Sequence, residues 1–273
     1  MSHRTAHPLV AATAAALLVP AAACNQAGRG NPHGDSGLLQ EVRTRLAERE
    51  KKVAGFALTA EVTEGPHVAK YEFWFRAPNQ MRGDITEPAS FAYAFDGRFL
   101  YQQSDERRAL LVSELDPAKE STAVDLMQTF APFAPEGFRT PLIRKAGAVV
   151  QRVKHPLAAE AVEVKQTLRL DGYAHRVSYV LRWPSMDFLG KTVSSRQGTV
   201  ETRVDKESCV ASLGLCFPRE LSDWTEGRKS ATTVIPDLDL EEILPHEAFQ
   251  LDAPRGFFIQ QQFLDGGTVE RRR

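Results

Sequence analysis

The chain has 273 residues, 42% of them hydrophobic, and a formal net charge of −1. A chain with balanced charge has no electrostatic reason to bind nucleic acid, so the sequence argues against that class of function. The hydrophobic content is sufficient for a substantial core. The length after residue 36 suits one large all-β domain as well as two small ones.

The first 23 residues have the organisation of a secretory signal. Arg4 supplies a formal positive charge ahead of an Ala-, Leu- and Val-rich run over residues 8–19. That run is too short for a transmembrane helix, which needs about 20 apolar residues. Small residues at 21–23 follow it, as they do at a signal-peptide cleavage site. We therefore expect residues 1–23 to be a signal peptide.

Cys24 directly follows these small residues and precedes a polar stretch. The arrangement resembles the lipobox of bacterial lipoproteins. The resemblance implies cleavage before Cys24 and acylation of its thiol, and two or more acyl chains give stable membrane attachment. Asn25 follows the cysteine where Asp would imply retention in the inner membrane, so the expected location is the outer membrane, facing the periplasm. The alternative is an ordinary signal peptide cut near Ala23, with Cys24 an incidental thiol.

Residues 24–36 are rich in Gly, Asn and Pro without an apolar period, which predicts a flexible, lipidated tether. Asp35 or Ser36 is suited to cap a helix. Leu39, Val42 and Leu46 then follow i, i+3, i+7 spacing, which predicts a helix over 38–53 with one apolar face.

After Val53 the apolar period changes to two, which predicts about ten or eleven short strands. Turn signals such as Asp96-Gly97 and Asp171-Gly172 predict hairpins and antiparallel pairing. A second helix is expected near 122–130, ahead of an apolar loop rich in Pro and Phe. We expect a single domain over 37–262 and a polar C-terminal tail over 263–273.

Aromatic residues share one face of several predicted strands. Tyr71, Phe73 and Phe75 alternate with polar residues. A large sheet with one apolar face either packs on a second sheet or curls. A curled sheet covered by few helices leaves a hydrophobic cavity, whereas a β-sandwich uses the same aromatic residues as core. Periodicity alone does not decide between the two.

Three cysteines are present. If Cys24 is lipidated, Cys209 and Cys216 remain as a pair, and in an oxidising periplasm such a pair is expected to form a disulfide. A metal site is the alternative, but two thiols without a nearby histidine give too few ligands.

Sequence motifs of catalysis are absent. No His-Glu-x-x-His, Gly-x-Ser-x-Gly or phosphate-binding loop pattern occurs. Asp187, Asp223 and Glu226 lie near aromatic residues, where carboxylates are more often turn or edge residues. We expect a protein that is not an enzyme and has no cofactor or metal.

Residues 71–101 carry a combination of motifs. A strand ends at Arg76 ahead of Pro78, a second strand contains Arg82, and an Asp-Gly turn at 96–97 precedes an aromatic strand. This order resembles the LolA/LolB-like superfamily of periplasmic lipoprotein carriers and outer-membrane lipoprotein receptors. Residues 244–256 resemble its closing segment, in which a Phe precedes Pro-x-Gly. Gly83 departs from the pattern, because an aromatic residue is expected there. The chain is therefore interpreted as a distant member.

The resemblance implies a mainly β fold, with a curved antiparallel sheet forming a half-open barrel and two or three helices as plug and lid. Its apolar cavity would take the acyl chains of lipids or lipidated proteins. Arg76 and Arg82 are candidates to contact a ligand head group or the lid, the alternative being a solvated surface. Candidate cavity-lining residues are Tyr71, Phe73, Phe75, Phe91, Tyr93, Phe95, Met127 and Phe130.

Taken with Cys24, this resemblance predicts a membrane-anchored envelope lipoprotein that transfers or accepts lipids or lipoproteins. The alternative is an RseB-like envelope sensor or protein-interaction module that binds another envelope protein without lipid transfer.

Overall fold

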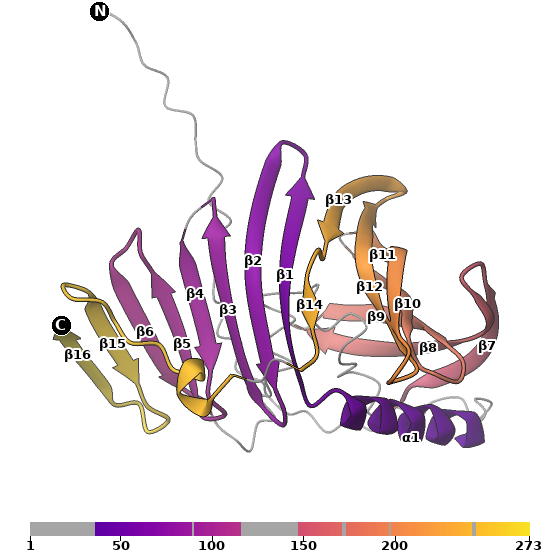
Figure 1. Ribbon diagram of the computed structural model, residues 1–273, viewed down its shortest axis with the longest axis horizontal. Helices are drawn as coiled ribbons and strands as arrows, with labels where there is room; N and C mark the ends of the chain where they lie inside the picture. The colour runs from indigo at the N-terminus through magenta and orange to yellow at the C-terminus, as the bar shows by residue number, and fades with distance from the viewer. Residues whose placement is uncertain (1–35, 89, 116–146, 171–172, 197, 242–243) are drawn as a thin grey trace, which may run out of the picture.

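The computed structural model describes residues 36–88, 90–115, 147–170, 173–196, 198–241 and 244–273, which form one strongly curved sheet with an α-helix at one end (Figure 1). The elements in chain order are α1 (Ser36–Lys52), β1 (Gly55–Glu64), β2 (His67–Arg76), β3 (Gln80–Glu87), β4 (Phe91–Phe95), β5 (Phe99–Ser104), β6 (Ala109–Glu114), β7 (Val149–His155), β8 (Ala158–Leu170), β9 (Tyr173–Arg182), β10 (Phe188–Ser195), β11 (Gly198–Val210), β12 (Leu215–Thr225), β13 (Arg228–Val234), β14 (Leu238–Asp239), the 3₁₀ helix η3 (His246–Phe249), β15 (Phe258–Gln262) and β16 (Thr268–Arg272).

The prediction of a mainly β, curved and open sheet is confirmed, but the predicted strand number is wrong. Over the described residues the sheet has 16 strands, not ten or eleven. The strands that were missed carry weak signals. β14 has only two residues. β15 is rich in Gln and β16 in charged residues. In β10, Gly190 interrupts the alternation of apolar and polar side chains. The described residues contain one α-helix rather than two or three, and the helix expected near 122–130 lies outside them.

The strand order shows how the chain builds an open sheet with β16 and β7 at its two edges. From β1 the strands pair outward in succession to β6, and from β7 at the opposite edge they pair inward to β13, which joins β1. All these pairs are antiparallel. After β14 the chain crosses one face of the sheet and adds β15 beside β6 in a parallel register, with β16 as the edge strand (Figure 1).

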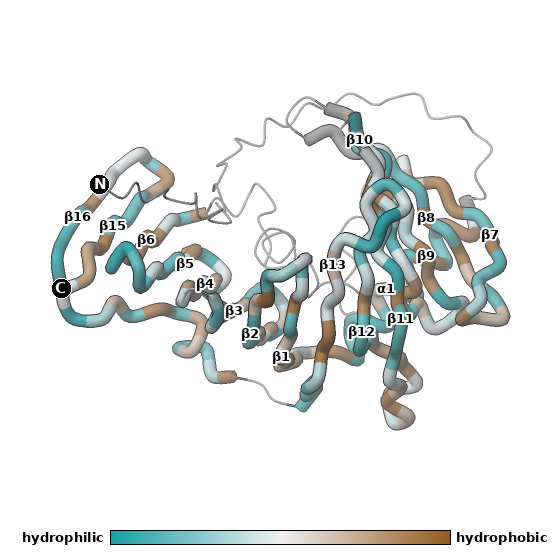
Figure 2. The backbone as a smooth tube through the Cα atoms, turned by 90° about the horizontal axis from the view of Figure 1, so that it is seen from above, coloured by the Kyte–Doolittle hydropathy of each residue, from teal (hydrophilic) through white to brown (hydrophobic). Residues whose placement is uncertain are grey.

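The sheet has a concave inner face and a convex outer face when it is seen from above (Figure 2). The inner face holds one hydrophobic cluster that reaches from Leu100 in β5 to Val150 in β7. The outer face of β4–β6 holds a smaller cluster, which the C-terminal segment covers with Leu251, Ala253 and Phe257. Side chains that alternate along each strand supply the two clusters.

Helix α1 packs its apolar stripe on the inner cluster. Leu38, Val42 and Leu46 are buried, with 9%, 0% and 6% exposure, and lie in the same cluster as Val150 and Phe217. The predicted helix over 38–53 is therefore confirmed within a residue or two at each end, which is the usual uncertainty of helix boundaries.

The last residues are polar, as expected, but they are not simply a tail. β16 pairs with β15 over its whole length, from Thr268 opposite Gln262 to Arg272 opposite Phe258. All five β16 residues are exposed, so the hydrophobic alternation that marks a half-buried strand is missing here.

Candidate functional site

The aromatic face predicted from the sequence forms part of the inner cluster. Phe75 lies opposite Phe56 on one side and Met81 on the other, because β2 is paired between β1 and β3. The rings of Phe56 and Phe75 stack with centroids 5.5 Å apart, and Phe73 lies 5.9 Å from Phe56. A continuous wall of aromatic and aliphatic carbon therefore lines the concave side of β1–β5.

The predicted cavity-lining residues differ in burial. Phe73, Phe75, Tyr93 and Phe95 are at most 2% exposed. Tyr71 and Phe91 are half-buried and pack against the same cluster. Burial raises the pKa of both Tyr71 and Tyr93 above the ordinary value of a phenol. Met127 and Phe130 lie outside the described residues.

Gly83 makes room for the ring of Tyr93. The two residues are opposite each other in the β3–β4 pair. A Cβ at position 83 would lie 2.2 Å from Cζ of Tyr93, far inside a normal contact. The ring therefore occupies the space that an aromatic residue at position 83 would need. The departure of Gly83 from the expected pattern thus has a local packing reason.

Replacing Gly83 with Ala is expected to lower the free energy of unfolding by about 1–3 kcal/mol, because the added methyl group overpacks the inner face. Urea denaturation measures the change. Combining it with Tyr93→Leu should cost less than the sum of the two single substitutions, since the smaller side chain vacates the space. A single substitution without effect on stability would contradict the described packing.

Arg76 and Arg82 lie on the outer face, opposite the aromatic residues. Trp74 and Arg76 alternate with the inner-facing Phe73 and Phe75 along β2. Arg82 of β3 is paired with Trp74 and therefore lies on the same outer face. Their guanidinium groups donate to backbone carbonyls of the C-terminal segment, Arg76 to Leu244 at 3.3 Å and Arg82 to Ala248 at 3.2 Å. Arg76 and Arg82 were expected to contact a ligand head group or the lid, or to lie on a solvated surface; in the structure their partners belong to the C-terminal segment. Their hydrogen bonds hold the segment around η3 against the outer face of the sheet.

Gln166 is a polar residue of the inner face that the sequence analysis overlooked. It continues the alternation of Val162 and Val164 on β8 and lies opposite Val177. Its side chain is 5% exposed, and neither amide atom has a hydrogen-bond partner among the described residues. An isolated glutamine at an apolar position of the alternation was the signal available in the sequence.

No protein-family model matches the sequence, and no curated protein matches it significantly. Solved structures do match. A LolA superfamily protein from Nitrosomonas europaea aligns with 77% of this chain and 97% of its own, at 12% identity and a TM-score of 0.47. A domain described as an outer membrane lipoprotein-sorting protein, from Vibrio parahaemolyticus, aligns with 78% of this chain and 95% of its own, at 12% identity and 0.52. A DUF1329 family protein from Desulfovibrio piger aligns with 78% of this chain and 96% of its own, at 9% identity and a TM-score of 0.53.

The chain has a LolA-like fold. At these identities the likeness concerns the fold alone. Among the described residues, no helix of the LolA-like domain has the length and apolar character needed to cross a membrane.

The outer face of the LolA-like sheet has an open cleft of about 490 Å³, lined by residues of β1 and β2, by Arg219 of β12 and by residues 236–239. Trp74 forms part of its wall, and Arg82 lies 5.7 Å above the Trp74 ring. Arg219 at the other wall donates to the carbonyls of Ile235 and Pro236. This cleft is shallow and partly polar, unlike the inner cluster, so it is poorly suited to an acyl chain.

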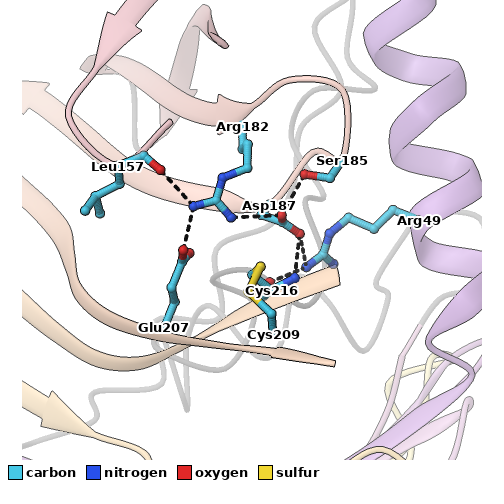
Figure 3. Close-up of a disulfide and its surroundings, with 8 residues drawn as sticks. All are labelled: Arg49, Leu157, Arg182, Ser185, Asp187, Glu207, Cys209 and Cys216. Atoms are coloured by element: carbon cyan, nitrogen blue, oxygen red, sulfur yellow. Dashed lines mark hydrogen bonds and ion pairs between the residues drawn. A yellow bond between two sulfur atoms is a disulfide. The ribbon is translucent and has the colours of Figure 1, made fainter. Parts of the chain in front are cut away.

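A buried ionic network joins α1 to the second half of the LolA-like sheet (Figure 3). Asp187 is 2% exposed and accepts hydrogen bonds from Arg182 at 3.1 Å and from Ser185 at 2.6 Å. Arg49 of α1 is 5% exposed and lies 3.6 Å from the Asp187 carboxylate. Asp187 was expected to be a turn or edge residue. It follows β9 in the chain, but the fold buries it under α1.

The disulfide predicted between Cys209 and Cys216 is present and belongs to the same network. The Cys216 N–H donates to Asp187 at 3.0 Å, and its carbonyl accepts from Arg49 at 3.1 Å. Glu207 lies within 4.8 Å of both sulfur atoms but is bonded to Arg182 at 2.6 Å. Since the sulfur atoms bond each other, the two cysteines join β11 to β12 and do not offer thiolates to a metal.

Proposed function

We propose that this protein is a membrane-anchored lipoprotein of the bacterial cell envelope that binds acyl chains, of lipids or of lipidated proteins, against the inner face of its LolA-like sheet. The observation that carries the proposal is the aromatic wall of β1–β5 on the concave side. A binding role, rather than a catalytic one, fits an apolar wall of this kind.

Hydrophobic burial would supply the affinity. Each methylene taken out of water contributes about 0.8 kcal/mol. Because Phe73, Phe75 and Tyr93 are buried, an acyl chain reaches them only if covering residues move. Such a step offsets part of the binding energy and keeps the complex weak enough for release. The amide of Gln166, on the same face, can donate to or accept from an ester or amide of the ligand.

Cys24 would anchor the curved sheet, with its concave inner face, at a membrane. The residue lies outside the described part of the chain, so its acylation is a proposal from the lipobox-like sequence. A soluble carrier must leave the membrane, whereas a chain acylated at Cys24 cannot do so readily. We therefore infer a tethered acceptor or sensor, at the outer membrane and facing the periplasm.

Substituting Cys24 by Ser is expected to abolish incorporation of labelled palmitate when the full chain is produced in a bacterium that processes lipoproteins. The matched control is the double variant Cys209→Ser with Cys216→Ser, which should still be labelled because those thiols form the disulfide. Labelling that persists without Cys24 would rule out the anchor. Loss of label in the control alone would place the acylated thiol elsewhere.

Titration with a fluorescent fatty acid tests the binding face itself. The mature chain carrying Cys24→Ser should bind the probe, and phospholipid should displace it. If the chain instead captures one envelope protein and binds neither probe nor lipid, the sensor or interaction module becomes the better description.

A further inference from the structure

The fold brings three separate stretches of arginine to one corner of the sheet. Arg107 and Arg108 occupy the β5–β6 turn, Arg255 precedes β15, and Arg271–Arg273 end the chain in and after β16. We call this set of six residues the arginine corner. All six are exposed, and the sequence alone shows only that they are far apart along the chain.

Backbone pairing holds the three stretches together. The Arg108 carbonyl accepts from the N–H of Phe258 at 2.9 Å, at the start of β15. The Arg273 carbonyl accepts from the N–H of Gly256 at 2.7 Å, next to Arg255. Phe258 lies opposite Arg272 in the β15–β16 pair and opposite Ala109 in the β15–β6 pair. The arginines are therefore fixed on neighbouring strand ends rather than scattered on a loose segment.

Most of these arginines have no carboxylate partner among the residues that the structure describes. Within the described residues only Arg273 forms an ion pair, to Asp252 at 3.4 Å across the surface. Elsewhere on the sheet basic groups face acids, as in Arg203–Glu201 at 2.7 Å and Lys206–Glu220 at 2.6 Å. Four carboxylates occur near the corner in sequence, fewer than the arginines: Asp105, Glu106, Asp252 and Glu270. The corner therefore carries excess positive charge in a chain whose formal net charge is −1.

Apolar side chains are exposed beside the arginines. Phe258 is 37% exposed next to Arg272, and Val269 on the same edge strand is 51% exposed. Guanidinium groups together with an exposed aromatic ring suit the boundary between charged head groups and acyl chains. A purely polyanionic partner would be recognised by the charges alone and would leave these apolar neighbours in water.

We propose that the arginine corner docks the protein on a membrane surface rich in anionic phospholipid. The corner belongs to the edge of β16, at the opposite end of the strand order from β7, and α1 packs in the same cluster as Val150 of β7, so docking at the corner leaves α1 free of the bilayer. The choice of a membrane as the partner rests on the proposed envelope location. The docking itself needs neither the acyl anchor nor the inner face.

Vesicle co-sedimentation tests the proposal with the mature chain carrying Cys24→Ser, so that no acyl anchor contributes. The chain should bind vesicles of phosphatidylcholine mixed with phosphatidylglycerol and not vesicles of phosphatidylcholine alone, and high salt should weaken the binding. Each arginine near an anionic surface changes the partition coefficient about fivefold. Arg271→Gln with Arg272→Gln should therefore lower it about 25-fold.

The matched control removes the same charge from the other half of the sheet, with Arg228→Gln and Lys229→Gln at the exposed start of β13. It should leave vesicle binding nearly unchanged. Equal binding to both kinds of vesicle, or equal loss in the control, would overturn the proposal. So would binding to a soluble polyanion but not to vesicles. The fluorescent fatty acid titration should be unaffected by Arg271→Gln with Arg272→Gln, which separates failure of this docking from failure of the binding face.

Discussion

Replacing Asp187 with Ala should lower the free energy of unfolding by about 3–5 kcal/mol, because it leaves a buried positive charge without its partner. Arg49 and Asp187 are 5% and 2% exposed, so water cannot replace the lost carboxylate. The Cys216 N–H and the Ser185 hydroxyl lose their acceptor at the same time. Since Arg49 and Lys52 both donate from α1 to carbonyls of the β11–β12 hairpin, and only Arg49 depends on Asp187 for its charge partner, α1 should loosen first.

Urea denaturation measures the loss, and hydrogen exchange of α1 locates it. The control is Glu87→Ala, which also removes a carboxylate from an ion pair. The Lys70–Glu87 pair is about half exposed on both sides, so its removal should cost under about 1 kcal/mol. Asp187→Asn keeps the shape of the side chain, so its loss of stability should lie between those of Asp187→Ala and Glu87→Ala. A loss for Asp187→Ala no larger than for Glu87→Ala would show that the network contributes little to stability.

Replacing Phe75 with Ala should also cost about 3–5 kcal/mol, because it opens a cavity in the inner cluster. Phe75 is 2% exposed and stacks on Phe56 at 5.5 Å. The same substitution removes part of the proposed acyl-chain surface, so binding of the fluorescent fatty acid should weaken in the variant that remains folded.

Phe258→Ala is the matched comparison, since it removes the same side chain from strand β15, where the ring is 37% exposed. Its stability cost should be small, and fatty acid binding should not change. Phe75→Leu, which refills part of the cavity, should recover much of the stability. If it recovers stability but not binding, the ring itself contacts the ligand. If Phe75→Ala binds the probe as tightly as the unaltered chain, the inner face is not the binding surface.

Sequence patterns predicted the inner face well because burial and strand period coincide there. Phe73 and Phe75 on β2 and Tyr93 and Phe95 on β4 follow strict alternation, and each is buried in the inner cluster. The Cys209–Cys216 pair was predictable from cysteine number and compartment. These features depend on local spacing or on composition, which a sequence displays directly.

Other features depend on contacts between distant segments. Arg82 is two residues from Asp84, yet the partner that reveals its role is the carbonyl of Ala248 on the C-terminal segment. Asp187 is buried between α1, which supplies Arg49, and β12, whose Cys216 N–H donates to it. β16 follows no hydrophobic period, since an exposed edge strand needs only its backbone bonds to β15. None of these relations leaves a periodic signal in the chain.

The most direct test of acyl-chain binding is native mass spectrometry of the full chain purified from the membranes of the bacterium that produces it. We expect the chain to carry stoichiometric bound lipid or lipidated protein. This ligand should be lost when Phe75 is replaced by Ala but retained when Phe258 is replaced by Ala. A chain that carries its own acyl groups and no further lipid, with or without added phospholipid, would contradict the proposed function.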